Sequence, residues 1–278
     1  MIHAIFIWYG DILMSYALIG MVVVNLRNKN SESLFKWSLL FLIIPILVNL
    51  VIILGFDYLT HDFQSYAWKE LFPTAAELGS EVAIYRGNYL DQLQNRIEML
   101  KDVFPFEFLT LYFWRSGGFM ILGILLFREN FFSTNQDLRS FLKRWGLGMG
   151  VPASIWATYM YGAGPASPKE FALSQLALYC SSIPLTLGLA AWIVDWGKNT
   201  LTEAIAAAGR LAFTLYISQS ILSTLFFYGM GYFGSLPRTG QLLWTLGLWS
   251  TQVLFAVLYF KKFNQGPLEW VWRKLYQF

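Results

Sequence analysis

The sequence predicts an all-α fold, a polytopic transmembrane helix bundle of about seven spans. Of its 278 residues, 56% are hydrophobic and only 13% are charged, whereas soluble domains carry roughly 25% charged residues. Apolar stretches that approach or exceed the roughly 20 residues needed to cross a bilayer alternate with short charged stretches. Helices are expected because backbone polar groups in hydrocarbon must be satisfied internally. We expect one membrane domain over residues 1–278, with spans near 5–26, 37–56, 104–127, 145–162, 171–194, 211–233 and 241–260.

The loop charges predict an orientation. Lys and Arg number 13 in one set of alternate loops, which includes the C-terminal tail, and 6 in the other set. Cytoplasmic loops carry the excess of basic residues. The C-terminus is therefore expected in the cytoplasm and, with seven crossings, the N-terminus outside.

Two segments outside the spans have a character of their own. The acidic loop 57–103 contains YRGNYLDQLQNRIEMLKDVF, in which Leu90, Leu93, Ile97 and Leu100 follow a helical period. This pattern predicts an amphipathic external helix that either roofs a cavity or is a solvated connector. The tail 261–278 combines tryptophans with Arg273 and Lys274, which predicts a short helix in the cytoplasmic interface.

Several function classes lack a sequence signal. There is no His/Cys cluster with metal-ligand spacing, no glycine-rich phosphate loop and no GxSxG motif, so no metal site and no permanently bound cofactor are expected. Cys180 is the single cysteine and excludes an intrachain disulfide. The net charge of +3 comes from loop residues, so no nucleic-acid partner is expected, and the expected partner is the lipid bilayer.

Ionisable side chains at membrane depth are costly and mark functional sites by default. Asp11 in the first span and Arg115 in the third are such residues, and His3 lies at the mouth of the first span. On a regular helix, His3 and Asp11 are about 12 Å apart along the axis, too far for a direct contact. We therefore expect them to line one cavity at two depths, with Arg115 as the ionic partner of Asp11.

Structural interpretations stand beside these functional ones. An Asp11–Arg115 pair could simply join two helices, and His3 could be a solvated histidine near the chain start. Gly10 lets another helix approach closely. In the span GRLAFTLYISQSILSTLFFYG, interhelical hydrogen bonds account for most polar residues, and Gln219 is retained as a cavity residue.

These motifs resemble a known family. HAIFIWYGDILMSYALIG at one end, with GRLAFTLYISQSILSTLFFYG and KKFNQGPLEWVWR at the other, resembles the DUF418 (YeiB-like) family of bacterial membrane proteins. The resemblance extends over essentially the whole chain. It implies a location in the bacterial cytoplasmic membrane. Members usually carry further helices upstream of the histidine motif, so we expect either a naturally short member or one whose N-terminal part is absent.

The resemblance also implies an activity. The family is usually grouped with membrane acyltransferases, which implies acyl transfer from a cytoplasmic donor such as acyl-CoA to an extracytoplasmic acceptor. His3 and Asp11 would then be catalytic residues, and Gly10, Arg115 and Gln219 would belong to the substrate cavity. The alternative is a transporter or permease component, or a non-enzymatic membrane protein, and a homo-oligomer is left open.

Overall fold

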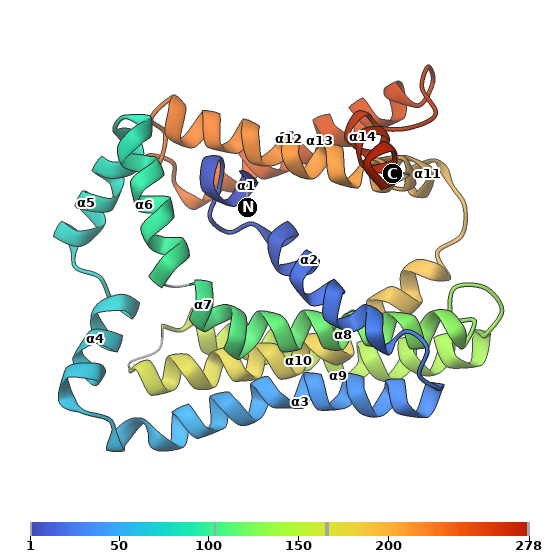
Figure 1. Ribbon diagram of the computed structural model, residues 1–278, viewed down its shortest axis with the longest axis horizontal. Coiled ribbons are helices and arrows are strands. Elements are labelled where there is room, and N and C mark those ends of the chain that lie inside the picture. Colours follow the sequence, from blue (N-terminus) through green and yellow to red (C-terminus); the bar gives the residue numbers. More distant parts are fainter. Residues whose placement is uncertain (1, 103, 165–166, 277–278) are drawn as a thin grey trace. The chain divides into compact units, whose positions relative to one another are not determined.

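The computed structural model describes residues 2–102, 104–164 and 167–276. The described residues form helices and no strand, which confirms the all-α prediction (Figure 1). The chain divides into two compact units: unit 1 contains residues 1–11, 76–101 and 197–278, and unit 2 contains 12–75 and 102–196. The principal helices of unit 1 are α1 (Ile2–Phe6), α5 (Ala75–Arg86), α6 (Tyr89–Asp102), α11 (Thr200–Arg210), α12 (Ala212–Thr224), α13 (Arg238–Tyr259) and α14 (Pro267–Tyr276). Those of unit 2 are α2 (Ile12–Val23), α3 (Ser31–Gly55), α4 (His61–Leu71), α7 (Phe104–Glu107), α8 (Phe113–Arg128), α9 (Gln136–Gly162) and α10 (Pro168–Val194).

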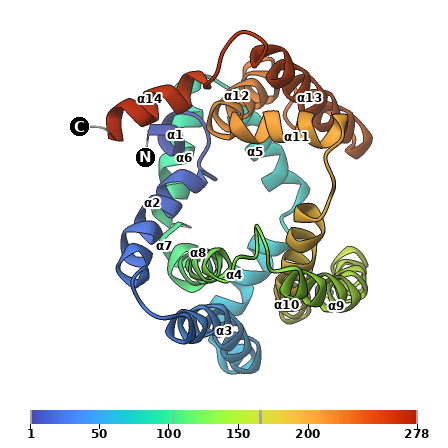
Figure 2. The same cartoon turned by 90° about the vertical axis from the view of Figure 1, so that its right-hand side faces the viewer.

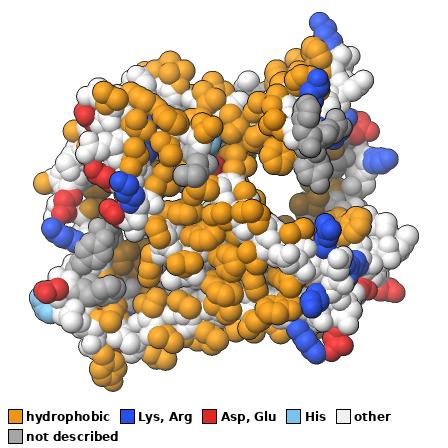
Figure 3. Space-filling model, viewed as in Figure 1, with side chains coloured by type: hydrophobic (Ala, Val, Ile, Leu, Met, Phe, Trp, Pro, Cys, Tyr) orange, Lys and Arg blue, Asp and Glu red, His pale blue; other side chains and the backbone are white. Residues whose placement is uncertain are grey.

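The described residues contain four helices that are long and apolar enough to cross a membrane, and a fifth candidate that is bent. The four are Ser31–Tyr58, Phe104–Arg128, α10 and α13. The fifth joins α11 to Ala212–Gly229 through a bend of 79°. Large apolar side chains such as Val51 and Leu243 are exposed on these helices, as lipid-facing side chains would be. Figure 3 shows hydrophobic side chains gathered over the long helices on the face in view.

Two of the seven expected spans differ in the structure. The first, 5–26, is not one helix, because α1 ends at Phe6 and the next helix, Ile12–Leu26, is shorter than a span. The fourth, 145–162, is part of α9, which is long enough to span a membrane but is too weakly apolar, because WGLGMGVPASIWATYMYG is rich in glycine, tyrosine and tryptophan. One of the two differences therefore comes from a helix break and the other from low hydropathy.

In unit 2, small residues let α9 and α10 pack closely, and the two helices run side by side in Figures 1 and 2. A Cβ on Gly146 would lie 2.6 Å from the carbonyl oxygen of Pro184, and one on Gly150 would lie 2.5 Å from the amide nitrogen of Leu185. Gly146 and Gly150 form a GxxxG pattern, which brings helix backbones together in membranes.

One end of the α9–α10 pair is held by an ionic cluster. Asp195, which follows α10, accepts hydrogen bonds from Lys143 at 2.5 Å and from Arg139 Nε at 2.7 Å. Both bonds lower the pKa of the Asp195 carboxyl, and the bond from Lys143 has the larger effect. Arg139 is buried and also donates to the carbonyl of Phe131, so the cluster ties the loop before α9 to the end of α10.

In unit 1, the bend between α11 and α12 is capped by a residue from α14. The Glu269 carboxylate accepts from the backbone N–H groups of Phe213 and Thr214 at 2.9 and 3.0 Å, and from the Thr214 hydroxyl at 2.5 Å. The first N–H groups of a helix have no intrahelical acceptor, and a negative charge there is favoured by the helix dipole. Gly266 leaves the room, since a Cβ at this position would collide with the Glu269 carboxylate.

The external loop contains the predicted helix, and its buried side overlaps the predicted stripe. In α6, Leu93, Ile97 and Leu100 are half-buried, Leu90 is 72% exposed, and the neighbouring polar residues Gln92 and Arg96 are the most buried. Arg86 at the end of α5 donates to the Phe233 carbonyl at 2.8 Å. The second part of the loop is therefore packed within unit 1 through polar contacts, which hydrophobic periodicity does not detect. The tail helix is present as α14, and residues 277–278 of the predicted tail lie outside the described residues.

Candidate functional site: a buried histidine–aspartate pair beside a polar cavity

His3 and Asp11 are in contact in the structure. Nδ1 of His3 lies 3.0 Å from Oδ1 of Asp11, and both side chains are buried. The expectation that eight residues of regular helix would separate them is wrong, because the helix stops between them. The amides of Ile7 and Trp8 both donate to the His3 carbonyl at 3.0 Å, and residues 7–11 then turn before α2 begins.

A tyrosine from α12 completes the pair. The hydroxyl of Tyr216 lies 3.1 Å from Oδ1 of Asp11, to which it donates, and its ring lies 5.2 Å from the His3 ring. Both ring nitrogens of His3 are buried and neither has a hydrogen-bond partner among the described residues, so the approach of Nδ1 to Asp11 is close but lacks hydrogen-bond geometry. An imidazole with one nitrogen beside a carboxylate has the other nitrogen available to accept a proton.

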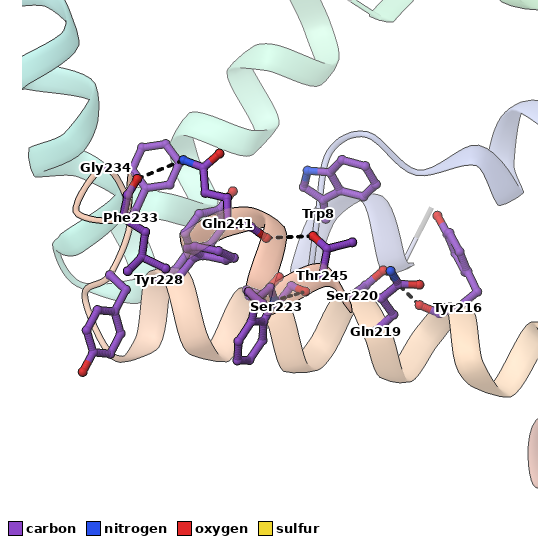
Figure 4. Close-up of a pocket in the computed structure, with 15 residues that line it drawn as sticks. Trp8, Tyr216, Gln219, Ser220, Ser223, Tyr228, Phe233, Gly234, Gln241 and Thr245 are labelled. Atoms are coloured by element: carbon purple, nitrogen blue, oxygen red, sulfur yellow. Dashed lines mark hydrogen bonds between the residues drawn. The ribbon is translucent and has the colours of Figure 1, made fainter. Parts of the chain in front are cut away.

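Tyr216 also lines a cavity of about 590 Å³ in unit 1 (Figure 4). His3 and Asp11, which were expected to line one cavity at two depths, are not among the described residues that line it, and Tyr216 connects the pair to it. Gln219, predicted as a cavity residue, lines it together with Ser220 and Ser223 from the same helix. Trp8 comes from the N-terminal segment. The other lining residues come from the segment 227–236, which follows α12, and from the N-terminal part of α13. No charged side chain is among the described residues that line this cavity: Trp8, Tyr216, Gln219, Ser220, Ser223, Thr224, Phe227, Tyr228, Tyr232, Phe233, Gly234, Leu236, Gln241, Trp244 and Thr245.

Gly10 has a local role in placing Trp8. A Cβ on Gly10 would lie 2.7 Å from Cζ2 of the Trp8 ring, so only glycine lets the indole fold back over the turn. The sequence interpretation was that Gly10 lets another helix approach closely. In the structure, the group that approaches Gly10 is the side chain of Trp8. Through Trp8, Gly10 contributes to the cavity without lining it among the described residues.

Arg115 lies in unit 2, on α8. Its guanidinium carbon is 5.7 Å from the centroid of the Tyr179 ring, a cation–π distance. The Tyr179 hydroxyl in turn donates to the Leu42 carbonyl at 2.9 Å. Within unit 2, Arg115 therefore belongs to the contact between α8, α10 and α3. Its pairing with Asp11 stays a prediction.

Sequence reasoning missed Tyr216, Trp8 and Trp244 as site residues. Tyr216 is three residues before Gln219, so helical spacing puts both on one face, and that signal was present in the sequence. The bond from Tyr216 to Asp11 joins residues 205 positions apart and leaves no local pattern. No group of three or more metal-ligating side chains occurs within the described ranges.

Comparison with known proteins identifies the family. A family model described as "Protein of unknown function (DUF418)" matches residues 126–278. The chain belongs to the DUF418 family. This member is 28% identical to the uncharacterized protein YeiB of Escherichia coli, over 99% of the chain and 71% of the relative. It is 27% identical to the uncharacterized protein YxaH of Bacillus subtilis, over 98% of the chain and 67% of the relative. No solved structure matches the chain.

Proposed function

We propose that this DUF418 member is an integral membrane acyltransferase of the bacterial cytoplasmic membrane, with His3 as its general base or acyl carrier. The observation that supports the proposal most is the 3.0 Å contact between buried His3 and Asp11, next to a cavity whose wall includes Tyr216. A histidine beside a carboxylate is an arrangement that acyl transfer uses to activate a hydroxyl or amine.

In the proposed reaction, Nε2 of His3 removes the proton of the acceptor while the acceptor atom attacks the carbonyl carbon of an acyl thioester such as acyl-CoA. The new acyl bond forms, the C–S bond breaks, and the thiolate takes the proton from the imidazolium. Asp11 stabilises the imidazolium and holds the ring, and Tyr216 holds the carboxylate. This division of roles follows from the order of contacts, His3 to Asp11 to Tyr216.

The cavity favours an uncharged acceptor with hydroxyl or amino groups. Its lining combines aromatic rings with amides and hydroxyls, such as Gln219, Ser223 and Gln241, and has no charged group among the described residues. Such a lining offers hydrogen bonds in an apolar setting and no counter-charge for an ionic ligand. With a cytoplasmic C-terminus, as the loop charges favour, the acceptor is extracytoplasmic and the donor cytoplasmic.

The test is transfer of radiolabel from acetyl-CoA to protein, lipid or glycan in membranes that contain the chain. We expect label that falls at least a hundredfold in His3→Ala, since general base catalysis supplies about 10²–10⁴ in rate. Asp11→Asn is expected to lower it as well, and His61→Ala, at an exposed histidine of α4, is the matched control. Label that persists unchanged in His3→Ala, in protein that is inserted and folded, refutes the proposal.

A transport function is the second candidate, and one observation favours it. The α11–α12 pair is a broken helix with a 79° bend, and broken helices are a feature of secondary transporters. In that case Asp11 carries the coupling proton. Proton-coupled uptake that is abolished by Asp11→Asn, without any acetyl transfer, supports this candidate against the enzyme.

A further inference from the structure

A second polar feature of unit 1 is not used by the proposed reaction. Arg96 on α6 is 0% exposed, the most completely buried charged side chain among the described residues. Its Nε donates to the Ile5 carbonyl of α1 at 3.0 Å. Nη1 and Nη2 are both buried and have no hydrogen-bond partner among the described residues.

The surroundings of the guanidinium are aromatic. The Tyr89 ring lies over it, with 5.2 Å between the guanidinium carbon and the ring centroid. The rings of Tyr85 and Tyr228 stack on each other with 4.7 Å between their centroids, and both residues interact electrostatically with Arg96. The described residues form no ion pair with Arg96. A cation–π contact offsets only part of the cost of a buried charge, and the fork of four N–H groups at Nη1 and Nη2 is left without an acceptor.

A groove of about 670 Å³ lies along the same side of α6. Tyr89 and Gln92 line it, with Phe6 and Tyr228 from other elements. Arg96 is four residues beyond Gln92 and therefore one turn further along the same helix face. Tyr89 belongs to both features, because its ring covers the guanidinium and its side chain lines the groove, while its hydroxyl donates to the Phe6 carbonyl at 2.9 Å.

We propose that Arg96 is the anchor of an anion-binding site that takes a carboxylate or phosphate group. A planar guanidinium with two free amino groups binds such oxyanions through two parallel hydrogen bonds. Burying an unpaired charge is strongly unfavourable. Because folding has already removed water from the Arg96 guanidinium, an anion that reaches Nη1 and Nη2 does not have to bear that desolvation cost when it binds. The ligand enters along the groove, and Tyr89 turns aside to admit it. This site is independent of acyl transfer at His3.

The test measures the thermal unfolding midpoint, Tm, of the purified full chain in an uncharged detergent against increasing anion. One arm adds inorganic phosphate or acetate, and the other adds phosphatidylglycerol, with phosphatidylcholine for comparison. A ligand that binds only the folded protein raises its Tm. We expect a rise of several degrees in one of the two arms, which identifies the source of the anion as soluble or lipid.

Arg96→Met and Lys101→Gln are the decisive pair. Lys101 is an exposed basic residue in the last turn of the same helix and is not among the described residues that line the groove, so Lys101→Gln is expected to keep the anion response. Arg96→Met is expected to lose it and, without anion, to unfold at or above the wild-type Tm, because it removes an unpaired buried charge. A wild-type Tm that no anion moves, or an equal response in Arg96→Met, overturns the proposal. So does a Tm of Arg96→Met far below that of the anion-free wild type, which would mark a structural arginine.

Discussion

Replacement of Glu269 tests the cap that joins α14 to the start of α12. Glu269→Ala removes the acceptor of two backbone N–H groups and of the Thr214 hydroxyl. Hydrogen bonds to a charged group contribute about 1.5–3 kcal/mol each when intact, but losses within one network are not additive, and water can satisfy a part-buried site. We therefore expect a loss of about 3 kcal/mol in the free energy of unfolding. At about 2–4 °C per kcal/mol, the Tm falls by about 6–12 °C.

The same cap has a pH signature. Burial raises the pKa of the Glu269 carboxyl, but the hydrogen bonds from Thr214 and Phe213 lower it more, so its pKa in the folded chain is below the ordinary 4.5. A carboxyl with a lowered folded pKa stabilises the fold above its unfolded pKa, and this contribution is lost as the pH falls through the folded value. The wild-type Tm is thus expected to fall more steeply than that of Glu269→Gln below about pH 4.5.

The assay is thermal unfolding followed by circular dichroism in detergent, between pH 3 and 7. The control is Glu203→Gln, an exposed acidic residue in the first turn of α11, which is expected to leave the Tm within about 1–2 °C of wild type. If Glu269→Ala unfolds at the wild-type Tm, or if Glu269→Gln keeps the full acid sensitivity, the carboxylate is not the cap that the geometry indicates.

Three further predictions concern unit 2. Gly150→Ala is expected to lower the Tm, because its Cβ would lie 2.5 Å from the α10 backbone. Gly148→Ala is the control and should leave the Tm unchanged, because a Cβ there has nothing within 4 Å. Equal Tm values of the two variants would contradict the close packing of α9 on α10. Lys143→Ala removes the hydrogen bond that most lowers the pKa of Asp195, so this pKa should rise toward 3.8 in a carboxyl NMR titration. An unchanged pKa would show that Lys143 does not cause its lowering. Tyr179→Phe removes one buried hydrogen bond to α3 and should cost about 1 kcal/mol in denaturant unfolding; no change would show that the bond is replaced.

The sequence by itself determined the fold class and most of the long helices. Spans such as 37–56, 171–194 and 241–260 are encoded locally, because apolar composition over about 20 residues is enough to specify a membrane helix. Helical spacing likewise predicted α6, and the run of hydroxyl and amide groups in α12 pointed to Gln219 in a cavity. These features depend on neighbours a few residues apart.

Only the tertiary structure decided the site. His3 reaches Asp11 because α1 ends at Phe6, and the apolar pattern continues unbroken through that end. Polar side chains of α6 can be buried because backbone carbonyls accept from them, as that of Ile5 does from Arg96. The contacts of Tyr216 with Asp11 and of Glu269 with Thr214 join distant positions. Hydropathy records how a side chain partitions between water and lipid, whereas these pairings depend on which donors and acceptors folding brings within hydrogen-bond distance of one another.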